Sequence, residues 1–121
     1  METIKNTPIV IGNYQGVNFH YIFNENDRFL INASDIAKHF NIDLSAFLAN
    51  QEADRWIKHL LKKANTEGKS RTIDDIVLIE NGIYYFHKFL IYELTKPYHD
   101  FYWWIDEFFY DLMVKYQNPL N

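Results

Sequence analysis

Over the first third of the chain, apolar and aromatic positions are grouped or alternate with polar ones, as is typical of short β-strands. An apolar run at residues 8–11 is followed by the turn residues Gly12, Asn13 and Gly16, and alternation resumes over residues 17–23. A polar turn at residues 24–27 precedes a third run at residues 28–31. This pattern predicts a small N-terminal antiparallel β-meander.

The apolar positions then take the spacing of a helix, at residues 33, 36, 37 and 40. Asn32 is expected to cap this helix, and residues 41–43 interrupt it before Asp43 caps a second short helix over residues 44–48. Two short helices joined by a three-residue turn have the shape of a helix-turn-helix. We expect this pair to act largely as scaffold, because Asp35 and Asp43 would weaken the approach of a phosphate.

A longer helix is predicted over residues 53–64, with apolar residues on one face and basic residues on the other. Residues 65–72 are polar and contain a glycine, which predicts an exposed loop or the tip of a wing. Two apolar runs, residues 76–79 and 83–86, flank Asn81 and Gly82, the pair that favours a type I′ turn. This segment therefore predicts a wing β-hairpin.

The last third predicts two helices, over residues 87–95 and about 98–116, separated by a stop at Lys96 and Pro97. In the second helix, aromatic and aliphatic residues form a core stripe, and the other face is acidic with two aromatic side chains. The whole pattern predicts one α+β domain over residues 1–121: a β-meander, a short helix pair, a basic helix with a wing hairpin, and two aromatic-rich C-terminal helices. The tail, residues 117–121, is expected to be frayed.

Composition narrows the class of protein. A chain of 121 residues fits one compact domain, and the absence of cysteine excludes a disulfide scaffold and a thiolate metal site. No stretch approaches the roughly 18 apolar residues of a membrane span, and the first residues do not resemble a signal peptide. We therefore expect a soluble protein of the cytoplasm, which would be the host cytoplasm if a phage encodes it.

The charge is distributed unevenly along the chain. The net charge is −4, which argues against indiscriminate coating of nucleic acid. Residues 54–71, however, carry six basic and two acidic side chains, a net +4, whereas the segments before and after them carry −3 and −5. Positive charge is thus focused in one short region.

Two segments resemble motifs of the KilA-N domain, which occurs in proteins of phages and large DNA viruses and is related to the APSES fold of fungal transcription factors. Residues 29–36, Phe-Leu-Ile-Asn-Ala-Ser-Asp-Ile, are similar to the strand-to-helix motif of that family, and residues 82–87 resemble its glycine-to-histidine turn into a helix. Leu90, Leu94 and the aromatic stretch 101–109 are similar to its paired C-terminal helices. The resemblance covers about residues 9–113 and implies DNA binding without catalysis, in a phage or prophage regulatory or accessory protein.

The candidate interface with double-stranded DNA is the basic helix and the loop after it. Arg55, Lys58 and Lys62, at spacings of three and four residues, suit successive phosphates along one groove edge. The remaining basic residues and their polar helpers are His59, Lys63, Lys69, Ser70, Arg71, Thr72, Asn50 and Gln51. The alternative is that the lysine-rich face is simply solvated.

A protein partner is the rival hypothesis. Trp103 and Tyr110 lie seven residues apart on the acidic face of the last helix, beside Asp106 and Glu107, and exposed aromatics at this spacing mark partner surfaces. The partner would be a host protein or a second copy of the chain. The alternative is that the N-terminal strands cover both aromatics.

Enzymatic and metal sites are not expected. The five histidines lie in different elements without a pair at metal-ligand spacing, and the adjacent carboxylates of Asp74 and Asp75 point in different directions. No nucleophilic triad, phosphate-binding loop or dinucleotide motif is present. We therefore expect no cofactor, no metal and no catalytic residue. His87 is expected to order the turn into its helix through a hydrogen bond from its ring.

Overall fold

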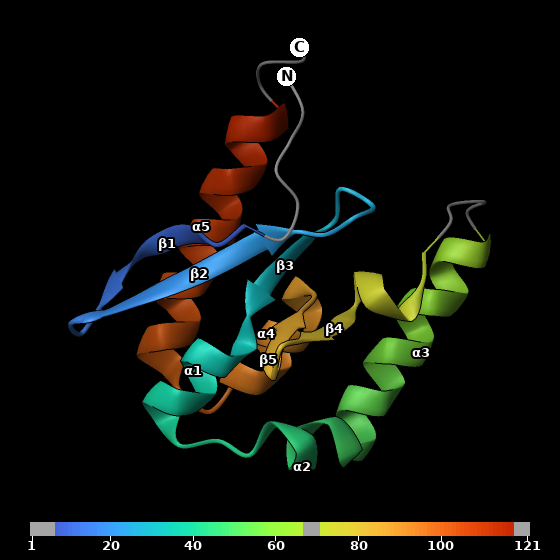
Figure 1. Cartoon of the computed structure of the whole chain (residues 1–121), viewed down its shortest axis with the longest axis horizontal. Helices are drawn as coiled ribbons and strands as arrows, with labels where there is room; N and C mark the ends of the chain where they lie inside the picture. The colour runs from blue at the N-terminus through green and yellow to red at the C-terminus, as the bar shows by residue number, and fades with distance from the viewer. Residues whose placement is uncertain (1–6, 67–70, 118–121) are drawn as a thin grey trace.

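The computed structural model describes residues 7–66 and 71–117 and shows an α+β fold in which a five-stranded antiparallel sheet packs against helices (Figure 1). The strands are β1 (Ile9–Tyr14), β2 (Val17–Phe23), β3 (Phe29–Asn32), β4 (Val77–Glu80) and β5 (Ile83–Phe86). The helices are α1 (Ala33–Phe40), α2 (Leu44–Ala49), α3 (Gln51–Thr66), α4 (Lys88–Thr95) and α5 (His99–Gln117), with a 3-10 turn, η1 (Ile73–Asp75), before β4. The predicted fold class is confirmed.

The N-terminal meander and the later hairpin belong to a single sheet. The strand order is β1-β2-β3-β5-β4, because β5 pairs with β3 and places Ile31 opposite Phe86. The tight turn between β4 and β5 is also as predicted, since Asn81 and Gly82 have φ of 53° and 78°. The hairpin is therefore anchored along β3, and it extends the sheet instead of standing apart as a wing.

The sheet separates a large core from a smaller cluster. Paired residues on neighbouring strands share a face, and Tyr21, Ile31 and Phe86 lie on the face that packs against the helices. The intervening residues Ile22 and Leu30 form the smaller cluster with Tyr85 on the opposite face. The main core is completed by fully buried apolar residues of the helices, among them Ile36, Leu60, Leu90, Ile91, Phe101 and Ile105.

Residues 32–35, where β3 passes directly into α1, form hydrogen bonds to α1 and to two other strands. Asn32 caps α1 by accepting from the backbone N–H of Asp35 at 3.0 Å, as predicted. The hydroxyl of Ser34 accepts from the backbone N–H of Tyr84 in β5 at 2.9 Å. The carboxylate of Asp35 lies 2.8 Å from the ring of His20 in β2. The residues that carry the resemblance to the KilA-N motif thus connect α1 to two strands.

Strand β1 packs closely against α5. A Cβ atom at Gly12 would lie 3.2 Å from the Trp104 ring, which is closer than most side-chain contacts. The ring of Tyr14 completes this packing, with its centroid 5.3 Å from Trp104 and 5.0 Å from Phe101. Glycine at position 12 therefore allows the indole to approach the strand.

The predicted helices are present with small shifts of their ends. Asp43 caps α2 through the backbone N–H of Ala46, and α4 ends at Thr95, before Pro97. Helix α4 contacts both α3 and α5 and lies between them (Figure 1). Helix α5 continues to Gln117, and the rest of the tail predicted to fray, residues 118–121, lies outside the described residues.

Candidate nucleic-acid interface

Helix α3 presents its apolar side to the core and its basic side to solvent. Ala53 and Leu60 are buried, and Trp56 and Ile57 are half-buried against the core. The five basic side chains predicted on the other side are all exposed: Arg55, Lys58, His59, Lys62 and Lys63. The amphipathic reading of this helix is therefore confirmed.

Two of these basic residues form ion pairs with acidic residues in the first turns of α3. Arg55 lies 2.8 Å from Glu52, and Lys58 lies 2.8 Å from Asp54. All four side chains are more than half exposed, and such pairs contribute only a few tenths of a kcal/mol. The pairs balance charge near the start of α3, and two further basic residues, Lys62 and Lys63, lie in its C-terminal half.

The basic face has dimensions that suit a DNA groove. Arg55 and Lys62 are separated by about 10 Å along the helix axis, given about 1.5 Å of rise per residue. A helix with its side chains is about 10–12 Å wide, and the major groove of B-DNA is about 12 Å wide. The exposed face can therefore follow one edge of a groove.

The segment after α3 is only partly described. Lys69 and Ser70, two of the predicted contacts, lie outside the described residues. Arg71 is half-buried, and its Nε is buried with no hydrogen-bond partner among the residues that the structure describes. Thr72 is exposed, but its backbone N–H donates to Asp75 at 3.0 Å.

A buried carboxylate fixes the position of this segment. Asp75 is 1% exposed and accepts hydrogen bonds from the side chains of Asn24 and Asn26, at 2.8 and 3.0 Å. Burial raises the pKa of Asp75, but these hydrogen bonds and the charge of Arg28 outweigh it and hold the pKa below the ordinary value. The ionised carboxylate thus ties Thr72 to the turn between β2 and β3.

Three basic side chains lie close enough to His87 to lower its pKa. Burial, followed by the positive charges of Arg71, Lys88 and Arg28, lowers the pKa of His87 to about 4. These three side chains come from the residues before η1, the start of α4 and the β2–β3 turn. Arg28 and Lys88 were not predicted as DNA contacts, and only the fold brings Arg28 and Arg71 near His87.

The two polar helpers at the start of α3, Asn50 and Gln51, differ in their surroundings. Asn50 accepts at its side-chain oxygen from the backbone N–H of Ala53 at 2.8 Å, which is the bond of an N-cap. That oxygen is therefore occupied in α3 and does not face a base edge. Gln51, the first residue of α3, is exposed.

The predicted partner surface on α5 is only partly as expected. Trp103 and Tyr110 are 66% and 67% exposed, so the N-terminal strands do not cover them, and Glu107 is exposed between them. Asp106 points elsewhere, because its carboxylate accepts from the hydroxyl of Tyr92 in α4 at 2.5 Å. Trp103, Glu107 and Tyr110 therefore form the α5 face.

The histidines remain apart in the fold, and their hydrogen bonds are structural. The ring of His87 caps α4 by accepting from the backbone N–H of Phe89 at 3.0 Å, as predicted, and His39 bonds to Gln15. In the part of the chain that the structure describes, no three His, Asp or Glu residues are placed to hold a metal ion. None of the described helices has the length and apolar character that a bilayer crossing requires.

Searches with protein-family models, among curated proteins and among solved structures find no match to this chain.

Proposed function

We propose that this chain is a DNA-binding domain of the KilA-N type, from a phage or prophage regulatory or accessory protein, and that it contacts duplex DNA without catalysing a reaction. The observation that carries the proposal is the exposed basic face of α3 in a chain whose net charge is −4. The proposed contacts to phosphate are Arg55, Lys58, Lys62, Lys63, Lys69 and Arg71.

The ion pairs at the start of α3 determine how this surface would work. Because Glu52 and Asp54 face Arg55 and Lys58, a phosphate that approaches there must replace an existing partner. Lys62, Lys63 and the segment after α3 add further basic residues to the same surface. We place the phosphate contacts along α3 and the segment after it, with Gln51 and His59 as candidate base readers.

The affinity expected from such a surface is modest and depends on salt. Most of the binding energy comes from release of counterions, and each phosphate contact contributes about 0.9 to the slope of log K against log salt. Non-specific binding through a few lysines corresponds to a Kd of roughly 10⁻⁴ to 10⁻⁶ M at physiological salt. Binding should therefore be detected first at low ionic strength.

The test is fluorescence anisotropy of a labelled mixed-sequence duplex over a range of salt concentrations. The variant Lys62→Gln/Lys63→Gln removes two charges from the basic face, and Lys38→Gln/Lys115→Gln removes two charges from exposed positions on α1 and α5. We expect the first variant to bind more weakly and to lose about 1.8 from the salt slope. The second variant should differ little from the wild type.

Two results would count against the proposal. One is the absence of wild-type binding even at low salt. The other is an equal loss of affinity in the two double variants, because that would show a response to total charge and not to the surface of α3.

A second candidate function rests on the α5 face. Trp103 and Tyr110 are large aromatic side chains that are about two-thirds exposed, and residues of this kind dominate many protein interfaces. An antiparallel pairing of two copies centred on this face would place Glu107 near its own counterpart. A basic protein of the host therefore suits the face better than a second copy of the chain.

This candidate is tested with Trp103→Ser/Tyr110→Ser, which removes both aromatics without changing the charge. If the face binds a protein, the variant should fail to capture a partner that wild type captures, and it should keep its affinity for DNA. Analytical ultracentrifugation of the wild type distinguishes the host partner from a dimer of this chain.

A further inference from the structure

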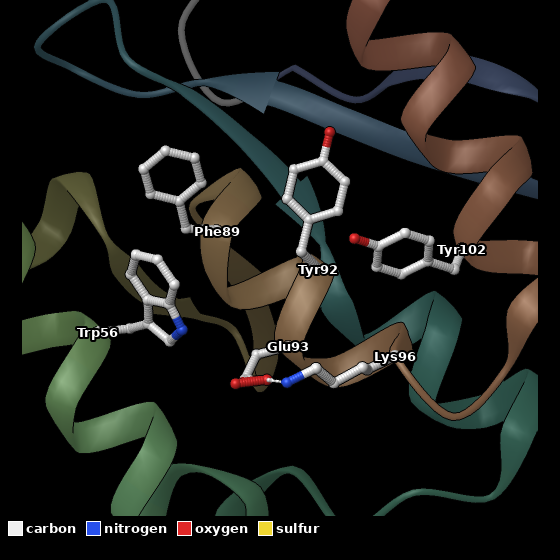
Figure 2. A pocket seen from close by; sticks show the side chains of 6 residues that line it. All are labelled: Trp56, Phe89, Tyr92, Glu93, Lys96 and Tyr102. Atoms are coloured by element: carbon white, nitrogen blue, oxygen red, sulfur yellow. Dashed lines mark hydrogen bonds and ion pairs between the residues drawn. The ribbon is translucent and has the colours of Figure 1, made fainter.

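Four aromatic rings line a hollow of about 280 Å³ between α3, α4 and α5. Trp56 comes from α3, Phe89 and Tyr92 from α4, and Tyr102 from α5 (Figure 2). The rings form two pairs, since Trp56 lies 5.2 Å from Phe89 and Tyr92 lies 5.3 Å from Tyr102, centroid to centroid. Three helices thus contribute rings to a space that their side chains do not fill.

A carboxylate completes the lining of this hollow. Figure 2 shows Glu93 with Trp56 on one side and Tyr102 on the other. The Glu93 side chain is only 10% exposed, and its carboxylate lies 3.1 Å from the ammonium group of Lys96. A carboxylate that is largely removed from water needs a positive partner, and here one turn of α4 supplies it.

The resident ammonium group is held weakly. The Lys96 side chain is 71% exposed, and its pairing with Glu93 immobilises a long, flexible side chain in solvent. A cation that also contacted the rings would form the same ion pair and add cation–π attraction, which is worth about 0.5–2 kcal/mol. Lys96 therefore shows that a cation can pair with Glu93 at this hollow, and its exposed side chain is easy to displace.

A second carboxylate, that of Asp106, lies at the hydroxyl end of Tyr92. The Tyr92 hydroxyl donates to it, and burial together with that carboxylate holds the pKa of Tyr92 well above its ordinary value. The side chain of Tyr92 therefore stays a neutral phenol that is hydrogen-bonded to the carboxylate of Asp106. With Glu93 in the lining and Asp106 at the far end of Tyr92, an anion is disfavoured and a cation is favoured.

We propose that this hollow binds a guanidinium or substituted ammonium group carried by a side chain of a partner protein, which displaces Lys96 from Glu93. A neighbouring hollow of about 530 Å³, which shares Glu93 and Lys96, gives room for the chain that carries the cation. None of the proposed DNA contacts lines the hollow formed by the four rings, so the proposal does not depend on the DNA contact.

The test uses acetyl-arginine amide and tetramethylammonium chloride as probes and follows the indole N–H signal of Trp56 by NMR. The signal is assigned with Trp56→Phe, because Trp103 and Trp104 give the other two indole signals. We expect a saturable shift with at least one of the two cations. The neutral isostere 3,3-dimethylbutanol, and sodium chloride at equal ionic strength, should not produce it.

Two variants separate recognition of the cation from general packing. Glu93→Gln should weaken binding of the cation about tenfold, since it removes an ion pair worth roughly 1.4 kcal/mol or more. Lys96→Gln should strengthen binding severalfold because it removes the resident competitor, while Lys115→Gln serves as the matched control. Equal binding of the neutral isostere, or no saturable shift in either wild type or Lys96→Gln, would overturn the proposal.

Discussion

His87 gives the protein a pH-dependent stability that can be worked out from its surroundings. Its ring accepts a hydrogen bond from the backbone N–H of Phe89, and only an unprotonated Nδ1 can accept. Burial, with nearby Arg71, Lys88 and Arg28, lowers its pKa to about 4, whereas the unfolded chain has a pKa of about 6.5. The folded state therefore keeps a neutral His87 through mild acid.

The sign and size of the effect follow from this difference. Between pH 6.5 and 4 the unfolded chain binds a proton at His87 and the folded chain does not, so stability is fully present above about pH 6.5 and is lost as the pH falls. Linkage over this interval predicts that the free energy of unfolding decreases by about 2 kcal/mol from pH 7 to pH 5. By pH 4 and below, the loss approaches about 3 kcal/mol.

Urea unfolding at pH 7 and pH 5 measures this loss. His87→Asn supplies another acceptor for the cap of α4 but does not titrate, so it should lose about 2 kcal/mol less than the wild type between the two pH values. His99→Asn changes an exposed histidine at the start of α5 and serves as the control, which should behave like the wild type. Because the other titrating groups are the same in the wild type and His87→Asn, their contributions to the pH dependence cancel in the comparison.

The reasoning would be refuted if wild type and His87→Asn lost the same stability between pH 7 and pH 5. That result would mean that His87 is protonated in the folded protein or exposed enough to titrate as it does in the unfolded chain. Calorimetry at the two pH values provides an independent check of the same difference.

Three further changes test the packing of β1, the cap of α3 and the β4–β5 turn, each by urea unfolding. Gly12→Val should destabilise the fold by about 1–3 kcal/mol because its methyl groups would meet the Trp104 ring, and an unchanged stability would contradict the close approach of β1 to α5. Asn50→Ala should cost about 1 kcal/mol through loss of the α3 cap, whereas Asn50→Asp should cost less; equal losses would mean that the side-chain oxygen does not cap. Gly82→Ala should cost about 1–2 kcal/mol because φ is 78°, and a neutral effect would argue against the type I′ turn.

The sequence predicted those features that depend on neighbouring residues. The caps at Asn32 and Asp43 and the turn at Asn81 and Gly82 each need only a few consecutive residues, and the structure contains all of them. The amphipathic character of α3 could also be predicted, because the spacing of its apolar residues is a pattern within a single helix. These local patterns were sufficient for the fold class.

Features formed by residues far apart in the chain could not be predicted in this way. The pairing of β3 with β5 joins strands about 55 residues apart. The hydrophobic pattern of a strand does not say which other strand it pairs with. The placement of Arg28 and Arg71 near His87 has the same origin. Glu93 gave no signal in the sequence, because a lone glutamate on a helix is usually solvated and only the three-helix packing buries it.

The central claim is that α3 and the segment after it contact duplex DNA, and NMR titration of the ¹⁵N-labelled chain with an unlabelled duplex at low salt tests it most directly. The proposal predicts that the amides that shift most lie in residues 54–63 and at Arg71 and Thr72, and that the shifts reverse when salt is raised. Shifts confined to α5, or no shift at any amide, would contradict it.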